Sequence, residues 1–298
     1  MAFSNRQKIC VMKNLIRKYY WDELSDAGFV SCKDEGFYWY RMVGDLLYTV
    51  RLPIFSPKTP LRLSIGFGVI PVFTWEHISS SLTFARDEPY YFTPGLGHVI
   101  APWAEAECSD CKELLGTLPR QDYFHPTLSH YTSEGILIEH LYTPKCGAEV
   151  LQELVFPMFR KLTTIRSIYD WNKMRSEKRF ARDRAMFWKS PNSLGTDIYI
   201  RNSFSQALAD ECLYLRDEDW YPRVLRFMEA MNEESYVTSM RFESKELEQE
   251  QIQEHEHRKN LIASLKSNDQ GAIDEELRAS AERMRANIRK KLPKLNPL

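Results

Sequence analysis

Two cysteines and two histidines in the middle of the chain have the residue types and spacing of a small zinc site. Cys108 and Cys111 are separated by two residues, and His125 and His130 follow. Tetrahedral zinc needs four thiolate or imidazole ligands that converge on one point, and ligands paired in sequence lose less entropy when they assemble. The pattern predicts a structural zinc ion, and a zinc-containing hydrolase is one functional hypothesis that follows from it.

The same cysteines also fit the core-facing side of a helix. Segment 105–115 has helical periodicity, which places Cys108 and Cys111 on one face at the spacing of ordinary core residues. Pro119 and Pro126 disturb the helix on which a zinc finger presents its histidines. In this second interpretation the chain needs no cofactor.

A basic segment at 160–189 is the second pattern that could carry a function. Lys and Arg greatly outnumber acidic residues there, and aromatic rings lie between them at Phe180, Phe187 and Trp188. Cations can neutralise phosphates while rings stack on bases, so the segment is a candidate site for nucleic acid or another polyanion. The candidate contacts are Arg175, Lys178, Arg179, Arg182 and Arg184.

An alternative for the basic segment is a solvated helix face that is neutralised within the same molecule. Segment 229–256 is about as acidic as 160–189 is basic, and the formal net charge of the chain is -1. This compensation makes nucleic-acid binding the less favoured of the two interpretations.

Sequence motifs of common enzymes are absent from the chain. It has no Gly-x-Ser-x-Gly and no His-Glu-x-x-His. Gly66-Phe67-Gly68 lacks the glycine spacing of a phosphate-binding loop. His255 and His257 lie in a strongly charged segment and are predicted to be exposed to solvent. The sequence therefore favours a protein that is not an enzyme.

Hydropathy, the N-terminal residues and the cysteine content predict a cytoplasmic protein. No apolar run approaches the roughly 18 residues of a membrane-spanning helix, and polar and charged residues occupy positions 4–8, where a secretion signal needs an apolar stretch. Six cysteines in 298 residues are expected to be free thiols in a reducing compartment.

Apolar periodicity predicts an α+β fold whose N-terminal part is an antiparallel meander packed with helices. An amphipathic helix over 6–24 ends near Gly28, which can adopt the left-handed conformation of a helix cap. Strands are predicted at 37–42, 46–52 and 61–69, and the alternation in the third predicts one buried face. Short connections make the pairing antiparallel.

The middle of the chain is predicted to be less regular. Little periodicity is present over 74–130 apart from a helical pattern at 103–115, and a further strand is predicted at 135–142. A helix over 148–174 must be kinked or split at Pro157, which removes a backbone donor.

The last part of the chain is predicted to be helical. Helices at 204–215 and 222–231 precede a tail rich in Glu, Gln, Lys and Arg, which is predicted to be broken at 267–271. The final helix has a narrow apolar stripe that should dock on the domain or pair with another helix. The stripe consists of Ile273, Leu277, Ala281, Met284, Ile288 and Leu292. The expected domains are an α+β domain at 1–190, a helical region at 191–242 and a charged helical tail at 243–298.

The N-terminal half resembles a bacterial family that is known only as domain of unknown function 4304. The resemblance lies in the aromatic-rich passage 36–46, in the strand Leu61-Arg62-Leu63-Ser64-Ile65-Gly66 and in Val155-Phe156-Pro157-Met158-Phe159. It implies a helix followed by aromatic strands and a later proline-containing helix, and it implies no catalytic residue.

Taken together, the sequence favours a cytoplasmic, non-catalytic protein that binds a protein partner or a second copy of itself through its C-terminal helix. Binding of nucleic acid and a zinc-containing hydrolase are the two alternatives, and no membrane is expected as a partner.

Overall fold

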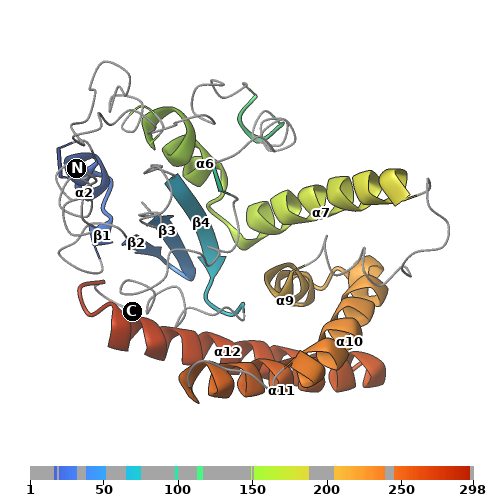
Figure 1. Cartoon of the computed structure of the whole chain (residues 1–298). Helices are drawn as coiled ribbons and strands as arrows, with labels where there is room; N and C mark the ends of the chain where they lie inside the picture. Colours follow the sequence, from blue (N-terminus) through green and yellow to red (C-terminus); the bar gives the residue numbers. More distant parts are fainter. Residues whose placement is uncertain are drawn as a thin grey trace, which may run out of the picture. The chain divides into compact units, whose positions relative to one another are not determined.

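The structure is a computed structural model of the whole chain (Figure 1), and it describes residues 17–18, 20–31, 38–51, 65–74, 98–99, 113–116, 149, 151–187, 205–238 and 245–295. The expected α+β class is confirmed, since an antiparallel sheet near the N-terminus is followed by C-terminal helices. The predicted strand at 135–142 and most of the segment 74–130 lie outside the described residues.

Two compact units make up the chain. Unit 1 comprises Met1–Ile70, Ser79–Thr163 and Asn287–Leu298, and unit 2 comprises Pro71–Ile78 and Thr164–Ala286. This grouping joins the charged tail helices to the preceding helical segments. The expected domain boundaries at 190 and 242 stay a prediction.

The sheet of unit 1 is a meander whose five strands lie side by side in chain order. The predicted hairpin is confirmed, with Tyr40 opposite Thr49 in an antiparallel pair. Its turn contains Gly44 at φ +56°, a left-handed conformation that glycine adopts at low steric cost. The strands are β1 (Val30–Ser31), β2 (Tyr38–Val43), β3 (Leu46–Arg51), β4 (Ile65–Pro71) and β5 (His98–Val99).

Strand β4 is buried on both faces, although the alternation of the sequence predicted one buried face. Phe67 and Val69 are buried as expected, and the neighbouring Gly68 and Ile70 are buried as well. The predicted strand began at 61, and residues 61–64 lie outside the described part. The short strand β5, which pairs antiparallel with β4, was not predicted.

Aromatic contacts join the helices of unit 1 to this sheet. Helix α2 (Trp21–Asp26) places Trp21 edge-on to Trp39 at 4.8 Å between ring centroids. Helix α6 (Phe156–Lys161) places Phe159 edge-on to Tyr48 at 5.1 Å. These contacts bury the aromatic residues that the sequence concentrates in the first third of the chain.

The predicted interruption near Pro157 has a specific form. The π-helical turn η2 (Leu151–Val155) immediately precedes α6, and Pro157 lies in the first turn of α6, where a missing N–H is tolerated. The helix itself ends later, at Leu162, and a new helix begins at Ile165.

Unit 2 is built from helices that pack in sequence. Helix α9 packs against α7 and α10, and α10 packs against α11. The helices are α7 (Ile165–Phe187), α9 (Gln206–Tyr214), the short 3-10 helix η3 (Glu218–Trp220), α10 (Tyr221–Thr238), α11 (Lys245–Ser267) and α12 (Gln270–Lys291). Both predicted helical segments at 204–231 are confirmed, and α10 extends beyond the predicted end.

The predicted break in the charged tail is a tight turn between α11 and α12. Asn268 adopts φ +54°, and the N–H of Asp269 bonds to the carbonyl of Ser264 at 2.9 Å, which is the pattern of a Schellman cap. The carboxylate of Asp269 then accepts a bond of 3.0 Å from the N–H of Ala272 and caps the start of α12.

The apolar stripe of α12 is buried within the chain. Each of the six residues named above is less than one-tenth exposed, so the prediction that this stripe must be covered is met within the molecule itself. Among the described helices, none combines the length and apolar character needed to cross a membrane.

Candidate functional site: a buried histidine between two carboxylates

The four predicted zinc ligands, Cys108, Cys111, His125 and His130, lie outside the described residues. Within the described part of the chain, no group of three or more His, Cys, Asp or Glu side chains is arranged to hold a metal ion. The zinc site therefore stays a prediction.

The predicted polyanion contacts all lie on α7, and the structure describes the surroundings of two of these side chains. Arg175 is only 8% exposed, and its guanidinium lies 5.6 Å from the centre of the Trp171 ring. Lys178 is half-buried, whereas only the backbone is described for Arg179, Arg182 and Arg184. Elsewhere on α7, Lys173 is bonded to Asp217 at 2.7 Å.

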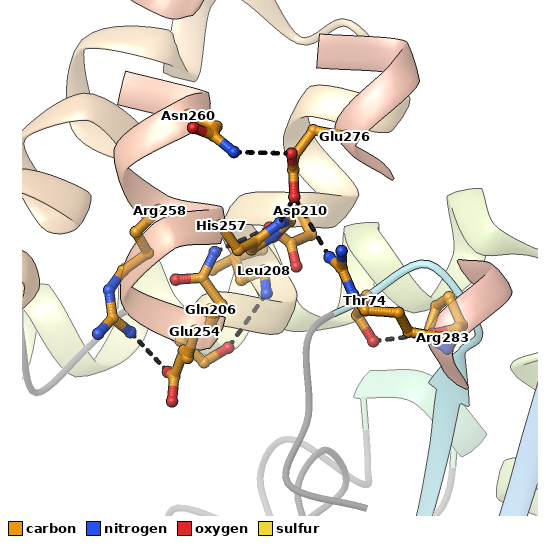
Figure 2. A network of polar contacts seen from close by, with 12 residues as sticks. Thr74, Gln206, Leu208, Asp210, Glu254, His257, Arg258, Asn260, Glu276 and Arg283 are labelled. Atoms are coloured by element: carbon orange, nitrogen blue, oxygen red, sulfur yellow. Dashed lines mark hydrogen bonds and ion pairs between the residues drawn. The ribbon is translucent and has the colours of Figure 1, made fainter. Parts of the chain in front are cut away.

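The most concentrated group of titratable side chains in the described part of unit 2 is centred on His257 (Figure 2). Its Nδ1 lies 2.9 Å from Glu276 Oε1, and its Nε2 lies 3.3 Å from Asp210 Oδ1. The histidine is on α11, Asp210 is on α9 and Glu276 is on α12. One imidazole ring therefore connects three helices.

The prediction that His257 is exposed to solvent is wrong. Its side chain is 1% exposed, and Asp210 is fully buried. The neighbouring His255 is half-buried. The helix carries many charges, but its inward face holds His257, Leu261 and Ser264 at helical spacing, so the buried stripe of α11 is not recognisable by hydrophobicity alone.

Additional donors complete the bonding of both carboxylates. Glu276 also accepts from Asn260 Nδ2 at 3.1 Å and from Arg283 Nη2 at 3.2 Å. Asp210 accepts from Gln206 Nε2 at 2.8 Å, one turn earlier on α9. Figure 2 shows these side chains pointing toward one another from α9, α11 and α12.

Local sequence determines where α9 begins and which of its positions Asp210 occupies. Ser205 caps the helix, because its hydroxyl oxygen accepts from the N–H of Leu208 at 3.1 Å. The following residues Leu208, Ala209, Cys212 and Leu213 are all buried. Asp210 lies between these apolar positions and is buried together with them.

The electrostatics of this cluster favour a charged histidine. Burial alone disfavours the imidazolium, but the attraction and hydrogen bonds of Asp210 and Glu276 outweigh burial and raise the pKa of His257 to about 9. The hydrogen bond from His257 is the largest cause of a pKa of about 2 for Glu276. The two shifts agree that a proton resides on the ring at neutral pH.

The next residue on α9, Glu211, has a carboxyl whose pKa is raised, in contrast to that of Glu276. Its side chain is buried and accepts from Asn172 Nδ2 of α7 at 2.9 Å. Burial is the largest cause and raises the pKa of Glu211 to about 8; the Asn172 bond lowers this pKa, and the negative charge of Asp210, a smaller effect, raises it. Two consecutive acids on one helix thus differ, since Asp210 has a buried cation partner and Glu211 holds a proton.

A second polar cluster lies at the end of α9. Asp217 accepts from Tyr169 Oη and from Lys173 Nζ, both at 2.7 Å. Burial opposes ionisation of Asp217, but the bonds from Lys173 and Tyr169 lower the pKa of its carboxyl. Lys173 Nζ also lies 4.8 Å from the centre of the Trp220 ring. This cluster joins α7 to the α9–α10 connection.

The arrangement around His257 is suited to holding helices together. A catalytic base needs a free nitrogen to receive a proton from substrate, whereas both ring nitrogens of His257 face carboxylates. Metal binding would need one of these nitrogens too. The buried thiol of Cys212 has a pKa raised to about 12 by burial, which makes it a poor nucleophile.

One signal in the sequence could have identified the cluster. Asp210 and Glu211 interrupt an otherwise apolar helical pattern, and a buried acid must be neutralised or paired. The sequence gives no indication of which cation would pair with it. His257 lies 47 residues away, in a helix whose charged composition predicts exposure.

Comparisons with protein-family models, with curated proteins and with solved structures found no match to this chain. The resemblance to domain of unknown function 4304 stays a prediction.

Proposed function

We propose that this chain is a non-catalytic cytoplasmic protein that acts by binding another protein or a second copy of itself. The observation that supports this most directly is the state of the His257 cluster. His257 and Asp210 are buried, and both ring nitrogens of His257 face carboxylates, which is the arrangement of a structural core rather than of a reaction centre.

The binding surface we propose differs from the stripe of α12. That stripe is already covered within the chain, so it leaves no apolar face there for a partner. Ile252 of α11 is 57% exposed and is one of the large apolar side chains on the described surface. Exposed apolar side chains on otherwise charged helices are common at protein interfaces, although single ones also occur on free surfaces.

Site-specific crosslinking of the full chain tests this proposal. A photo-crosslinking amino acid at Ile252 is compared with one at Asp170, whose side chain is 60% exposed on α7. We expect a discrete product from position 252, with the mass of two chains or of one chain plus a defined protein, and none from position 170. Equal labelling at both positions, or a monomer at every concentration in light scattering without any product, would contradict the proposal.

Truncation of the charged tail is not a suitable test. Removal of residues after 242 would delete α11 and α12, and with them His257 and Glu276. Asp210 would then lose a buried cation partner, which destabilises a protein by roughly 3 to 5 kcal/mol. Loss of binding in such a variant would report unfolding rather than an interface.

The two alternative functions predicted from the sequence, a zinc protein and a polyanion-binding protein, are tested by separate measurements. A zinc protein predicts one metal ion per purified chain and loss of that metal in Cys108→Ser. A polyanion-binding protein predicts affinity for DNA or RNA that falls steeply with salt and weakens when Arg179 and Arg182 become Glu.

A further inference from the structure

We propose that Asp210, His257 and Glu276 form a proton-operated lock that holds α11 and α12 against α9 while His257 is an imidazolium and releases them when the ring loses its proton. The lock would regulate the helical unit whatever the protein binds. The His257 ring lies between acids from two other segments of the chain (Figure 2).

With both carboxylates ionised, the hydrogen-bond geometry requires a charged ring. Each ring nitrogen lies within 3.3 Å of a carboxylate oxygen, and an ionised carboxylate can only accept. A neutral imidazole has one N–H and can serve one of these two acids. The imidazolium has two and can serve both Asp210 and Glu276.

Loss of the proton affects the two acids unequally. Glu276 keeps bonds from Asn260 and from the Arg283 guanidinium, and its side chain is partly exposed. Asp210 is fully buried and keeps the bond from the uncharged amide of Gln206, but it loses the positive charge that faces it from α11. A carboxylate that is buried opposite a neutral ring is strongly disfavoured. Separation of α11 from α9 lets water reach Asp210, so opening becomes easier.

Described cations on the neighbouring elements are bonded to acids other than Asp210. On α12, Arg283 is bonded to Glu276, and on α11, Arg258 is bonded to Glu254. On α10, Glu229 is paired with Lys266 at 2.6 Å. From α7, the uncharged amide of Asn172 faces Glu211. In the described part of the chain, Arg283, Arg258 and Lys266 therefore already have acidic partners.

Glu211 makes the lock sensitive to the same change in pH. It lies next to Asp210 on α9, and burial raises its pKa to about 8. Its ionisation adds a second negative charge to the buried part of α9 over the range in which His257 begins to lose its proton. Both titrations therefore favour opening at alkaline pH.

Amide hydrogen exchange of the full chain, read by mass spectrometry between pH 6.5 and 9.5, tests the lock. After correction for the intrinsic exchange rate, we expect protection of peptides from 255–285 to fall at least about tenfold, because each proton lost on opening changes the equilibrium up to tenfold per pH unit. Peptides from β2 and β3 serve as the internal reference. In Glu211→Gln, which keeps an amide in place of the protonated acid, the fall should be shallower.

Glu256→Gln is the matched control, since it removes one negative charge from α11 at a side chain that is 54% exposed. It should follow the wild-type profile. Protection of 255–285 that is independent of pH, or that falls in step with the β2 and β3 peptides, would overturn the lock. A Glu211→Gln profile as steep as wild type and Glu256→Gln would overturn the part assigned to Glu211.

Discussion

At the scale of single residues, two neighbouring acids of similar chemistry have different partners. Asp210 and Glu211 are adjacent on α9 and both are buried. The first faces the His257 ring at 3.3 Å, whereas the second faces the uncharged amide of Asn172. A carboxyl without a cation holds its proton when it is buried. Glu211 therefore adds no negative charge to the core at neutral pH.

Glu211→Gln should stabilise the protein increasingly as the pH rises. The carboxyl has a pKa of about 8 when folded and an ordinary value of 4.5, so its contribution to stability is complete below pH 4.5 and is lost as the pH rises to 8. Glutamine has no proton to lose. We expect little difference at pH 5 and a gain of about 1 kcal/mol or more at pH 9, measured by urea unfolding.

Glu256→Gln is the control for the urea unfolding of Glu211→Gln, because it removes an exposed charge on α11. Its effect should stay within about 0.5 kcal/mol at both pH values. A larger gain from Glu256→Gln than from Glu211→Gln at pH 9 would mean that general charge repulsion, rather than burial of Glu211, controls alkaline stability.

At the scale of helices and strands, local sequence determined most of the boundaries. The hairpin turn at Gly44, the cap at Gly28 and the break near Asn268 all depend on residues that favour particular backbone angles, and all three were predictable. The end of α6 at Leu162 was not predictable in this way, since Thr163 and Thr164 are only weak helix breakers. At that boundary a tertiary contact satisfies the backbone, since the Tyr48 hydroxyl donates to the Leu162 carbonyl at 3.0 Å.

Two substitutions at left-handed positions should change stability in opposite directions. Gly28→Ala places a side chain at φ +79° and should destabilise the protein by about 1 to 2 kcal/mol. Asn268→Gly relieves a non-glycine residue at φ +54° and should stabilise it by roughly 0.5 kcal/mol, a smaller effect because asparagine tolerates this conformation. Chemical unfolding at pH 6.5 measures both.

Gly28→Ala tests the backbone conformation at this position, because the added Cβ would not clash with its neighbours. A Cβ at Gly28 would meet Arg41 at 3.7 Å, which is ordinary contact with a flexible side chain. An unchanged stability in Gly28→Ala would show that this residue does not need its left-handed conformation. Destabilisation by Asn268→Gly would show that the asparagine side chain matters more than its backbone angle.

At the scale of the whole molecule, the fold class and the helical tail were predictable, and the polar cluster was not. Periodicity identifies the apolar stripe of α12, because Ile273, Leu277 and Ile288 contrast with charged neighbours. His257 looks like one more polar residue in a charged helix. Only the tertiary arrangement brings it to Asp210, and a single sequence carries no signal for that pairing.

The stability of the full chain should fall as the pH rises from 6.5 to 9. His257 has a folded pKa of about 9 and an ordinary value of 6.5, so its contribution is fully present below pH 6.5 and is lost through pH 9. Glu211 changes stability in the same direction up to pH 8. We expect the free energy of unfolding to decrease by roughly 1 kcal/mol or more per pH unit in this window. A constant or rising urea midpoint would contradict this linkage.

The most direct measurement is an NMR titration of the His257 ring in the full chain, with ring nitrogens labelled and the signal assigned by comparison with His257→Gln. The account predicts that both nitrogens carry protons at pH 7.5 and that the ring loses one proton near pH 9, while His255 provides the reference signal from the same helix. A His257 ring that is neutral at pH 7.5, with a single protonated nitrogen, would contradict the charged bridge between Asp210 and Glu276.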